Sequence, residues 1–282
     1  MKEKLALFNL PKERSALNPY AIMGNQTALY FSYITDFATI AKIVPPPLVP
    51  IAPIVSGYIS HIKEPSFSEE YNEAMLGVLV KFGDMVGMYP ISFLLAGKGA
   101  EMATYLGRDK TGLPKKMCER EDCIQLVQEG DVIRGTVERK GVMLMDVSMK
   151  LGEYNNPMVD QIYFSPAPGK STDGYSFYFS TYMQPDINGN AEFCNVNLLS
   201  NYVQYNYHTW TPGTVSARLQ SSSDDPWGQL PVLEMLGGGF SNNDLEMKEL
   251  KVMATPNAES VMPYLMTTRF DKCALKQEEK NV

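Results

Sequence analysis

Two adjacent lysines, Lys115 and Lys116, follow the segment Gly112-Leu113-Pro114 near the middle of the chain. A lysine pair is most often two solvated surface charges. A lysine amine that has lost its proton can instead condense with a ketone, and the resulting iminium is a better electron sink than the ketone. A free lysine has a pKa of about 10.4, so this chemistry needs a site that lowers the pKa by burial or through a neighbouring cation. Side chains alternate between faces in extended chain, so we expect burial of Lys115 to matter more than the charge of Lys116.

A short helix and many strands are predicted to position this segment. Apolar residues at spacings of three and four predict a helix over Glu101–Gly107, which ends at Gly107. Asp36 is a predicted cap for a second helix, Phe37–Ile43, which stops before three prolines. Runs of β-branched and aromatic residues predict strands over residues 27–34, 51–62, 74–82, 88–95, 132–138, 142–150, 175–183, 191–199, 203–210, 215–219 and 245–253. Gly237-Gly238-Gly239 is predicted to be a flexible connection.

The order of these elements indicates the fold class. No internal repeat or linker stands out, and short strands outnumber helices. We therefore predict one α+β domain over residues 1–282, in which a mainly antiparallel, barrel-like sheet carries a few short helices. Residues 1–25 and 276–282 are expected to be peripheral.

Composition excludes several classes of function. The hydrophobic fraction is 44%, the charged fraction 20% and the net charge −7. An acidic chain offers no clustered positive surface for nucleic acid. No apolar run approaches the length of a membrane span, so we expect a cytoplasmic protein that is not bound to a membrane. Four cysteines and two histidines are too few for a convincing metal site, and we expect neither a metal nor a cofactor.

The segment around the lysines, together with two segments upstream, resembles the acetoacetate decarboxylase family. Gly107-Arg108-Asp109 leads to Pro114-Lys115-Lys116, Glu73 precedes an apolar strand, and residues 44–48 are Val-Pro-Pro-Pro-Leu. The similarity extends to about residue 260. It implies a barrel-like fold in which Lys115 is the imine-forming lysine, with Lys116 and Glu73 as further catalytic residues. The alternative for Glu73 is a surface carboxylate at the start of a strand.

Two positions depart from the family pattern. The family has an arginine on the first strand, where this chain has Gln26, or Asn25 if the match slips by one residue. It also has a second glutamate where this chain has Tyr58. We expect Gln26, Tyr58, Phe93 and Arg108 to contact the substrate. Tyr58 could act as an acid or base, and Arg108 could bind a substrate carboxylate. The alternative for Arg108 is a charge favoured by the C-terminus of a helix.

The resemblance favours a decarboxylase that acts on a β-keto acid such as acetoacetate. An aldolase-dehydratase acting on pyruvate or another keto acid is the nearest alternative, because relatives in this superfamily keep the lysine for that chemistry. A non-catalytic barrel that binds small molecules remains a third hypothesis because of Gln26 and Tyr58. In each case we expect a small keto acid as the ligand and a homo-oligomeric protein.

Overall fold

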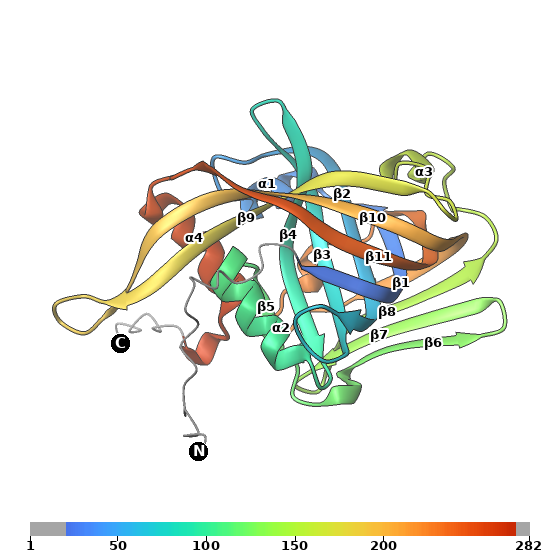
Figure 1. Cartoon of the computed structure of the whole chain (residues 1–282), viewed down its shortest axis with the longest axis horizontal. Helices are drawn as coiled ribbons and strands as arrows, with labels where there is room; N and C mark the ends of the chain where they lie inside the picture. The colour runs from blue at the N-terminus through green and yellow to red at the C-terminus, as the bar shows by residue number, and fades with distance from the viewer. Residues whose placement is uncertain (1–20, 275–282) are drawn as a thin grey trace, which may run out of the picture.

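The computed structural model describes residues 21–274 and is built mainly from strands (Figure 1). The predictions for residues 1–20 and 275–282 lie outside the described residues. The strands are β1 (Ile22–Ile34), β2 (Val49–Pro65), β3 (Tyr71–Phe82), β4 (Met85–Ala96), β5 (Lys115–Met117), β6 (Ile124–Glu129), β7 (Val132–Arg139), β8 (Val142–Leu151), β9 (Ser171–Pro185), β10 (Ala191–Leu219) and β11 (Glu234–Ala254). The α-helices are α1 (Phe37–Ile43), α2 (Ala100–Leu106), α3 (Val159–Ile162) and α4 (Ala258–Arg269). Shorter turns of other helix types cover Gly107–Thr111, Glu121–Cys123, Trp227–Gln229 and Lys272–Ala274.

Seven of the strands close into a ring. The hydrogen-bonded order is β10-β11-β1-β2-β3-β4-β9, and β9 pairs back to β10. Neighbours in the ring are antiparallel except β4 and β9, which meet in parallel at Met88 and Ser176. Closure removes the exposed edges that an open sheet would leave. The predicted antiparallel, barrel-like sheet with few short helices is confirmed.

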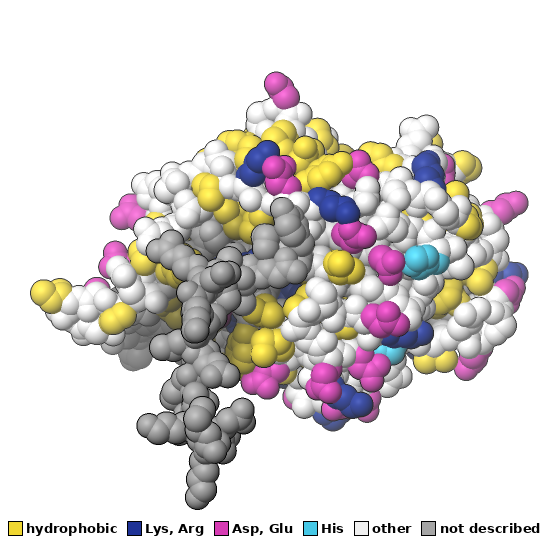
Figure 2. Space-filling model, in the orientation of Figure 1, with side chains coloured by type: hydrophobic (Ala, Val, Ile, Leu, Met, Phe, Trp, Pro, Cys, Tyr) yellow, Lys and Arg dark blue, Asp and Glu magenta, His cyan; other side chains and the backbone are white. Residues whose placement is uncertain are grey.

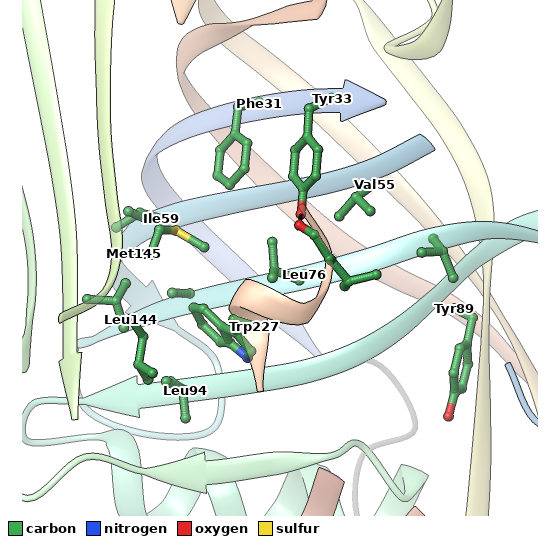
Figure 3. Close-up of a cluster of buried hydrophobic side chains, with 14 of the residues drawn as sticks. Phe31, Tyr33, Val55, Ile59, Leu76, Tyr89, Leu94, Leu144, Met145 and Trp227 are labelled. Atoms are coloured by element: carbon green, nitrogen blue, oxygen red, sulfur yellow. Dashed lines mark hydrogen bonds between the residues drawn. The ribbon is translucent and has the colours of Figure 1, made fainter. Parts of the chain in front are cut away.

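A second layer of strands covers part of the ring from outside. Residues 213–219 at the end of β10 pair with β8, and β7 and β6 continue from there. One cluster of buried side chains joins the ring to this layer (Figure 3). The ring contributes Phe31, Tyr33, Ile59 and Leu76, β8 contributes Leu144 and Met145, and the turn after β10 contributes Trp227. The main hydrophobic core therefore lies between the outer face of β1–β4 and the β6–β8 layer.

Alternation along the strands gives the ring a second, inner face. In β1, Leu29 and Phe31 belong to the outer core, whereas Ala28 and Tyr30 belong to a separate inner cluster. This is the period of two that a strand imposes on its side chains. The inner cluster is rich in aromatic residues and surrounds the cavity described below.

The structure corrects several sequence-based boundaries. The predicted strands over 191–199, 203–210 and 215–219 are parts of the single long strand β10. The three glycines 237–239 lie inside β11 instead of forming a connection. A Cβ on Gly238 would come within 1.8 Å of the Tyr30 carbonyl oxygen, so glycine allows β1 and β11 to approach. Residues 22–25, expected to be peripheral, begin β1. Helix α4 was not predicted, because Pro263 inside it weakens the helical pattern.

The surface carries charges of both signs. On the face shown in Figure 2, acidic and basic side chains lie interspersed. Within residues 21–274, none of the helices combines the length and the apolar character that crossing a membrane would require.

Candidate active site

A cavity of about 610 Å³ lies within the ring of strands. Its wall is largely apolar and aromatic, and seven tyrosines contribute to it: Tyr30, Tyr58, Tyr163, Tyr175, Tyr178, Tyr205 and Tyr207. Such a volume falls in the range of about 300–1,000 Å³ that is typical of small-molecule sites. Lys115, Glu73, Tyr58 and Phe93, which the sequence singled out, all line this cavity.

Lys115 reaches the cavity through the turn that follows α2. The predicted stop at Gly107 is not where this helical segment ends, because a π turn carries the chain on to Thr111. Gly112 then ends the segment with φ of 73°, which glycine adopts without strain. A Cβ there would lie 2.1 Å from the Phe179 carbonyl oxygen. The chain can turn here only because residue 112 is glycine, and strand β5 starts at Lys115.

Strand β5 fixes which way the two lysines point. It runs parallel to β4, with Lys115 opposite Phe93 and Lys116 opposite Leu94. Phe93 lines the cavity, whereas Leu94 belongs to the outer core. Lys115 therefore faces inward and Lys116 outward, as the predicted extended conformation required.

Lys115, Glu73 and Tyr58 form a connected chain of polar groups. The Lys115 Nζ donates to Glu73 Oε2 at 2.8 Å, and the Tyr58 hydroxyl donates to Glu73 Oε1 at 2.5 Å. Glu73 is 1% exposed and Lys115 4% exposed, so water screens this pair very little. Both oxygens of Glu73 have a proton-bearing partner, which allows its carboxylate to exchange a proton with the lysine. Glu73 is thus buried in the site, and the surface alternative is wrong.

Burial also sets the protonation state of the phenols. It raises the pKa of Tyr58 well above the usual value, and the negative charge and hydrogen bond of Glu73 add to the effect. The pKa of Tyr71 is raised in the same way, first by burial and then by Glu73. Both phenols therefore stay neutral at physiological pH, and Tyr58 remains the donor to Glu73.

Two aromatic rings face the amine of Lys115. The Nζ lies 5.5 Å from the centre of the Phe93 ring and 5.8 Å from that of Tyr71. Tyr71 was not among the predicted site residues. The signal was present, since Tyr71 and Glu73 are two residues apart and share a strand face, but the predicted strand began only at residue 74.

Lys116 belongs to a separate ionic cluster on the outer side. Its Nζ donates to the Asp224 carbonyl at 2.7 Å and to Asp225 Oδ1 at 3.3 Å. Arg139 contacts the same Asp225 carboxylate at 2.6 Å, and both cations also contact Asp271. Acidic partners therefore surround the charge of Lys116, and Lys116 is not among the residues that line the cavity.

Gln26 and Arg108 also lie outside the cavity lining. Gln26 is 1% exposed on β1, and its Oε1 has no hydrogen-bond partner within the part of the chain that the structure describes. The guanidinium of Arg108 lies 5.0 Å from the centre of the Phe270 ring. The lysines at the cavity wall are Lys115 and Lys110, and no arginine from residues 21–274 joins them. Sequence reasoning missed Lys110, which carries no motif of its own.

The comparisons with known proteins agree with this fold. Residues 5–256 match the family model described as acetoacetate decarboxylase (ADC). A CLA biosynthesis isomerase from Lactiplantibacillus plantarum is 36% identical over 253 residues, which cover 89% of each chain. Among solved structures, acetoacetate decarboxylase from Legionella pneumophila superposes with a TM-score of 0.69 at 19% identity, over 88% of this chain and 93% of the other. An acetoacetate decarboxylase-like enzyme from Sphingomonas wittichii gives 0.66 at 15% identity, over 84% and 93%.

The structural likenesses establish the fold, and the family match spans most of the sequence. The chain belongs to the acetoacetate decarboxylase family.

Proposed function

We propose that this protein is an isomerase that moves a carbon–carbon double bond into conjugation with a ketone through an imine on Lys115. The observation that carries the proposal is the contact of 2.8 Å between Lys115 and Glu73 inside a large apolar cavity. The name of the relative at 36% identity, an isomerase, supports this choice of reaction.

The first steps join the ketone to the lysine. Glu73 takes a proton from the Lys115 ammonium, and the neutral amine attacks the carbonyl carbon of the substrate. A proton passes from the nitrogen of the resulting adduct to its oxygen, and the protonated Glu73 returns its own proton to the same oxygen, which leaves as water. The product is an iminium next to a Glu73 carboxylate.

The following steps move the double bond. In an iminium with a β,γ double bond, the carbon between the two unsaturated groups is acidic, and Glu73 removes a proton from it to give a neutral dienamine. The same carboxyl group returns a proton at the γ carbon, which forms a conjugated iminium. Water hydrolyses this iminium to the α,β-unsaturated ketone and restores Lys115. No electron donor or acceptor enters these steps.

The cavity also favours a substrate with an extended apolar chain. Acetoacetate would fill a small part of about 610 Å³ and would leave most of the aromatic wall without contacts. The residues that replace the family's arginine and second glutamate are Gln26, which does not line the cavity, and Tyr58, which stays protonated. A ketone on a long hydrocarbon chain would bury more apolar surface against this wall than a small keto acid would.

Decarboxylation of a β-keto acid is the second candidate, and membership of the family favours it. The same Lys115 iminium would lose carbon dioxide to give an enamine, and Glu73, after taking a proton from water, would protonate the enamine carbon. Both reactions share the imine, so the product separates them.

The test supplies the protein with two ketone substrates. One is a long-chain β,γ-unsaturated ketone, and its conversion is followed by the ultraviolet absorbance of the conjugated product. The other is acetoacetate, followed by release of carbon dioxide. We expect conjugation with the first, loss of this activity in Lys115→Met, and retention in the surface variant Lys98→Met. Release of carbon dioxide without any conjugation would overturn the isomerase in favour of the decarboxylase.

A further inference from the structure

We propose that the ring faces of Phe93 and Tyr71 stabilise the positive charge of the Lys115 iminium and are catalytic residues for the isomerisation. The inference rests on the proposed imine chemistry and adds two residues that contact its reacting nitrogen. Both ring centres lie within about 6 Å of Nζ, the range in which an aromatic face attracts a cation.

The two rings are held by the strands that form the rest of the site. Phe93 is the direct register partner of Lys115 across β4 and β5. Tyr71 precedes Glu73 by two residues on β3, so both side chains emerge on the same face. Phe67 packs against Tyr71, with 6.2 Å between the ring centres. The positions of both rings are therefore set by strands of the same sheet as the lysine and the glutamate.

The hydroxyl group of Tyr71 indicates that its ring is the functional part. This oxygen is buried and has no hydrogen-bond partner in the described part of the chain. The nearby Tyr58 differs, because its hydroxyl donates to Glu73. The same residue type therefore serves two purposes, a ring face at position 71 and a proton donor at position 58.

The positive charge of the iminium needs a stabilising group whose own charge stays constant during the reaction. Glu73 gains and loses a proton in the proposed steps, so its attraction for the nitrogen comes and goes. The negative ring faces are permanent, and because Lys115 is 4% exposed, water weakens their attraction for the nitrogen only a little. They favour the protonated imine over the neutral one, and the protonated form is the one that withdraws electrons from the neighbouring carbon.

The electronic part of this effect can be separated from packing. Replacing Phe93 with mono-, di- and trifluorinated phenylalanine weakens the negative face stepwise while the ring keeps nearly the same size. We expect the logarithm of kcat for conjugation to fall with each fluorine, to a total loss of about two- to thirtyfold, the range of a cation–π contact at this depth. A flat series would overturn the proposal.

Variants at position 71 provide the matched control. Tyr71→Leu removes the ring and should lose about as much kcat as the trifluorinated Phe93 variant, whereas Tyr71→Phe keeps a ring face and should lose less than Tyr71→Leu. Tyr105→Leu, at an exposed tyrosine that does not line the cavity, should keep the kcat of the parent. Equal losses in Tyr71→Phe and Tyr71→Leu would contradict a role for the ring face.

Trapping the imine in the parent protein separates a failure of this inference from a failure of the proposed function. Each variant is also treated with a ketone and borohydride, and the adduct on Lys115 is quantified. If the parent forms the adduct while the fluorine series is flat, only the role of the rings is wrong. If the parent forms no adduct with any ketone, the imine chemistry fails and the role of the rings fails with it.

Discussion

Lys115 and Lys116 are consecutive, yet their amines bind carboxylates on opposite sides of the sheet. Lys115 contacts Glu73 inside the cavity, and Lys116 contacts Asp225 in the outer cluster. In the proposed mechanism, Lys115 performs the chemistry, while Lys116 takes part in the outer cluster. We therefore expect a cation at position 116, held among its own carboxylates, to have little influence on the amine of Lys115.

Lys116→Met should therefore lower the free energy of unfolding but leave the pH dependence of turnover unchanged. The change leaves Asp225, which is 2% exposed, with Arg139 as its remaining cation. Removing one partner of a buried ion pair costs about 3–5 kcal/mol, and the contact with Arg139 should hold the loss near the lower end. Urea unfolding measures this loss. The pH dependence of turnover, measured on the folded protein, should stay as in the parent, and a large displacement of that profile would show that the charge of Lys116 does act on Lys115.

Glu73→Gln should remove most of the activity without preventing the fold. Glutamine keeps the shape and can still accept from the Tyr58 hydroxyl, but it cannot carry a proton between Lys115 and the substrate carbon. Loss of a positioned general base typically costs about 10²–10⁴-fold in rate. The exposed variant Glu101→Gln is the matched control and should retain full turnover. Turnover of Glu73→Gln within tenfold of the parent would assign the proton transfers to another group.

Gly107→Ala should misplace the amine of Lys115. A Cβ at this position would lie 2.8 Å from Cδ and 2.9 Å from Cε of Lys115, so the lysine stem has to move. The stem is flexible, and we expect a melting temperature close to that of the parent. Turnover should fall by about tenfold or more, because a small displacement of a reacting atom is costly. Equal turnover in the two proteins would show that the position of the stem does not matter.

Alkaline pH should unfold the protein through its buried phenols. Burial raises the pKa of Tyr30, Tyr58 and Tyr71 well above about 10, the value of an exposed phenol. Above pH 10 the unfolded chain loses these protons while the folded chain keeps them, so stability falls as pH rises. Each such tyrosine contributes a slope of about 1.4 kcal/mol per pH unit. Absorbance of tyrosinate and circular dichroism, recorded together, check this prediction. Ionisation of these phenols in the still folded protein would contradict it.

Much of the fold could be predicted from the sequence because local signals and packing agree. Helix α1 follows the predicted cap, since the Asp36 side chain accepts from the Thr39 amide. The antiparallel pairs β7–β8 and β9–β10 include the predicted strands over residues 132–138, 142–150, 175–183 and 191–199. The closure of the ring and the continuous strand β10 could not be predicted, because they depend on pairings between residues far apart in the chain.

The candidate site was predictable where a residue follows a motif or a strand face. Lys115, Glu73 and Phe93 lie together because β3, β4 and β5 are neighbours in the sheet. Gln26 and Arg108 were assigned to the substrate site by their place in the family pattern, and neither lines the cavity. What decided their position is the packing around them, including the Phe270 ring beneath Arg108, and a sequence motif carries no information on such contacts.

Imine formation at Lys115 can be tested by trapping the imine on this residue. The protein is incubated with a long-chain ketone, reduced with borohydride, digested and analysed by mass spectrometry. We predict a single modified peptide in which Lys115 carries the ketone minus its oxygen atom, and no such product in Lys115→Met. Labelling spread evenly over surface lysines, or turnover that persists in Lys115→Met, would contradict imine chemistry at Lys115.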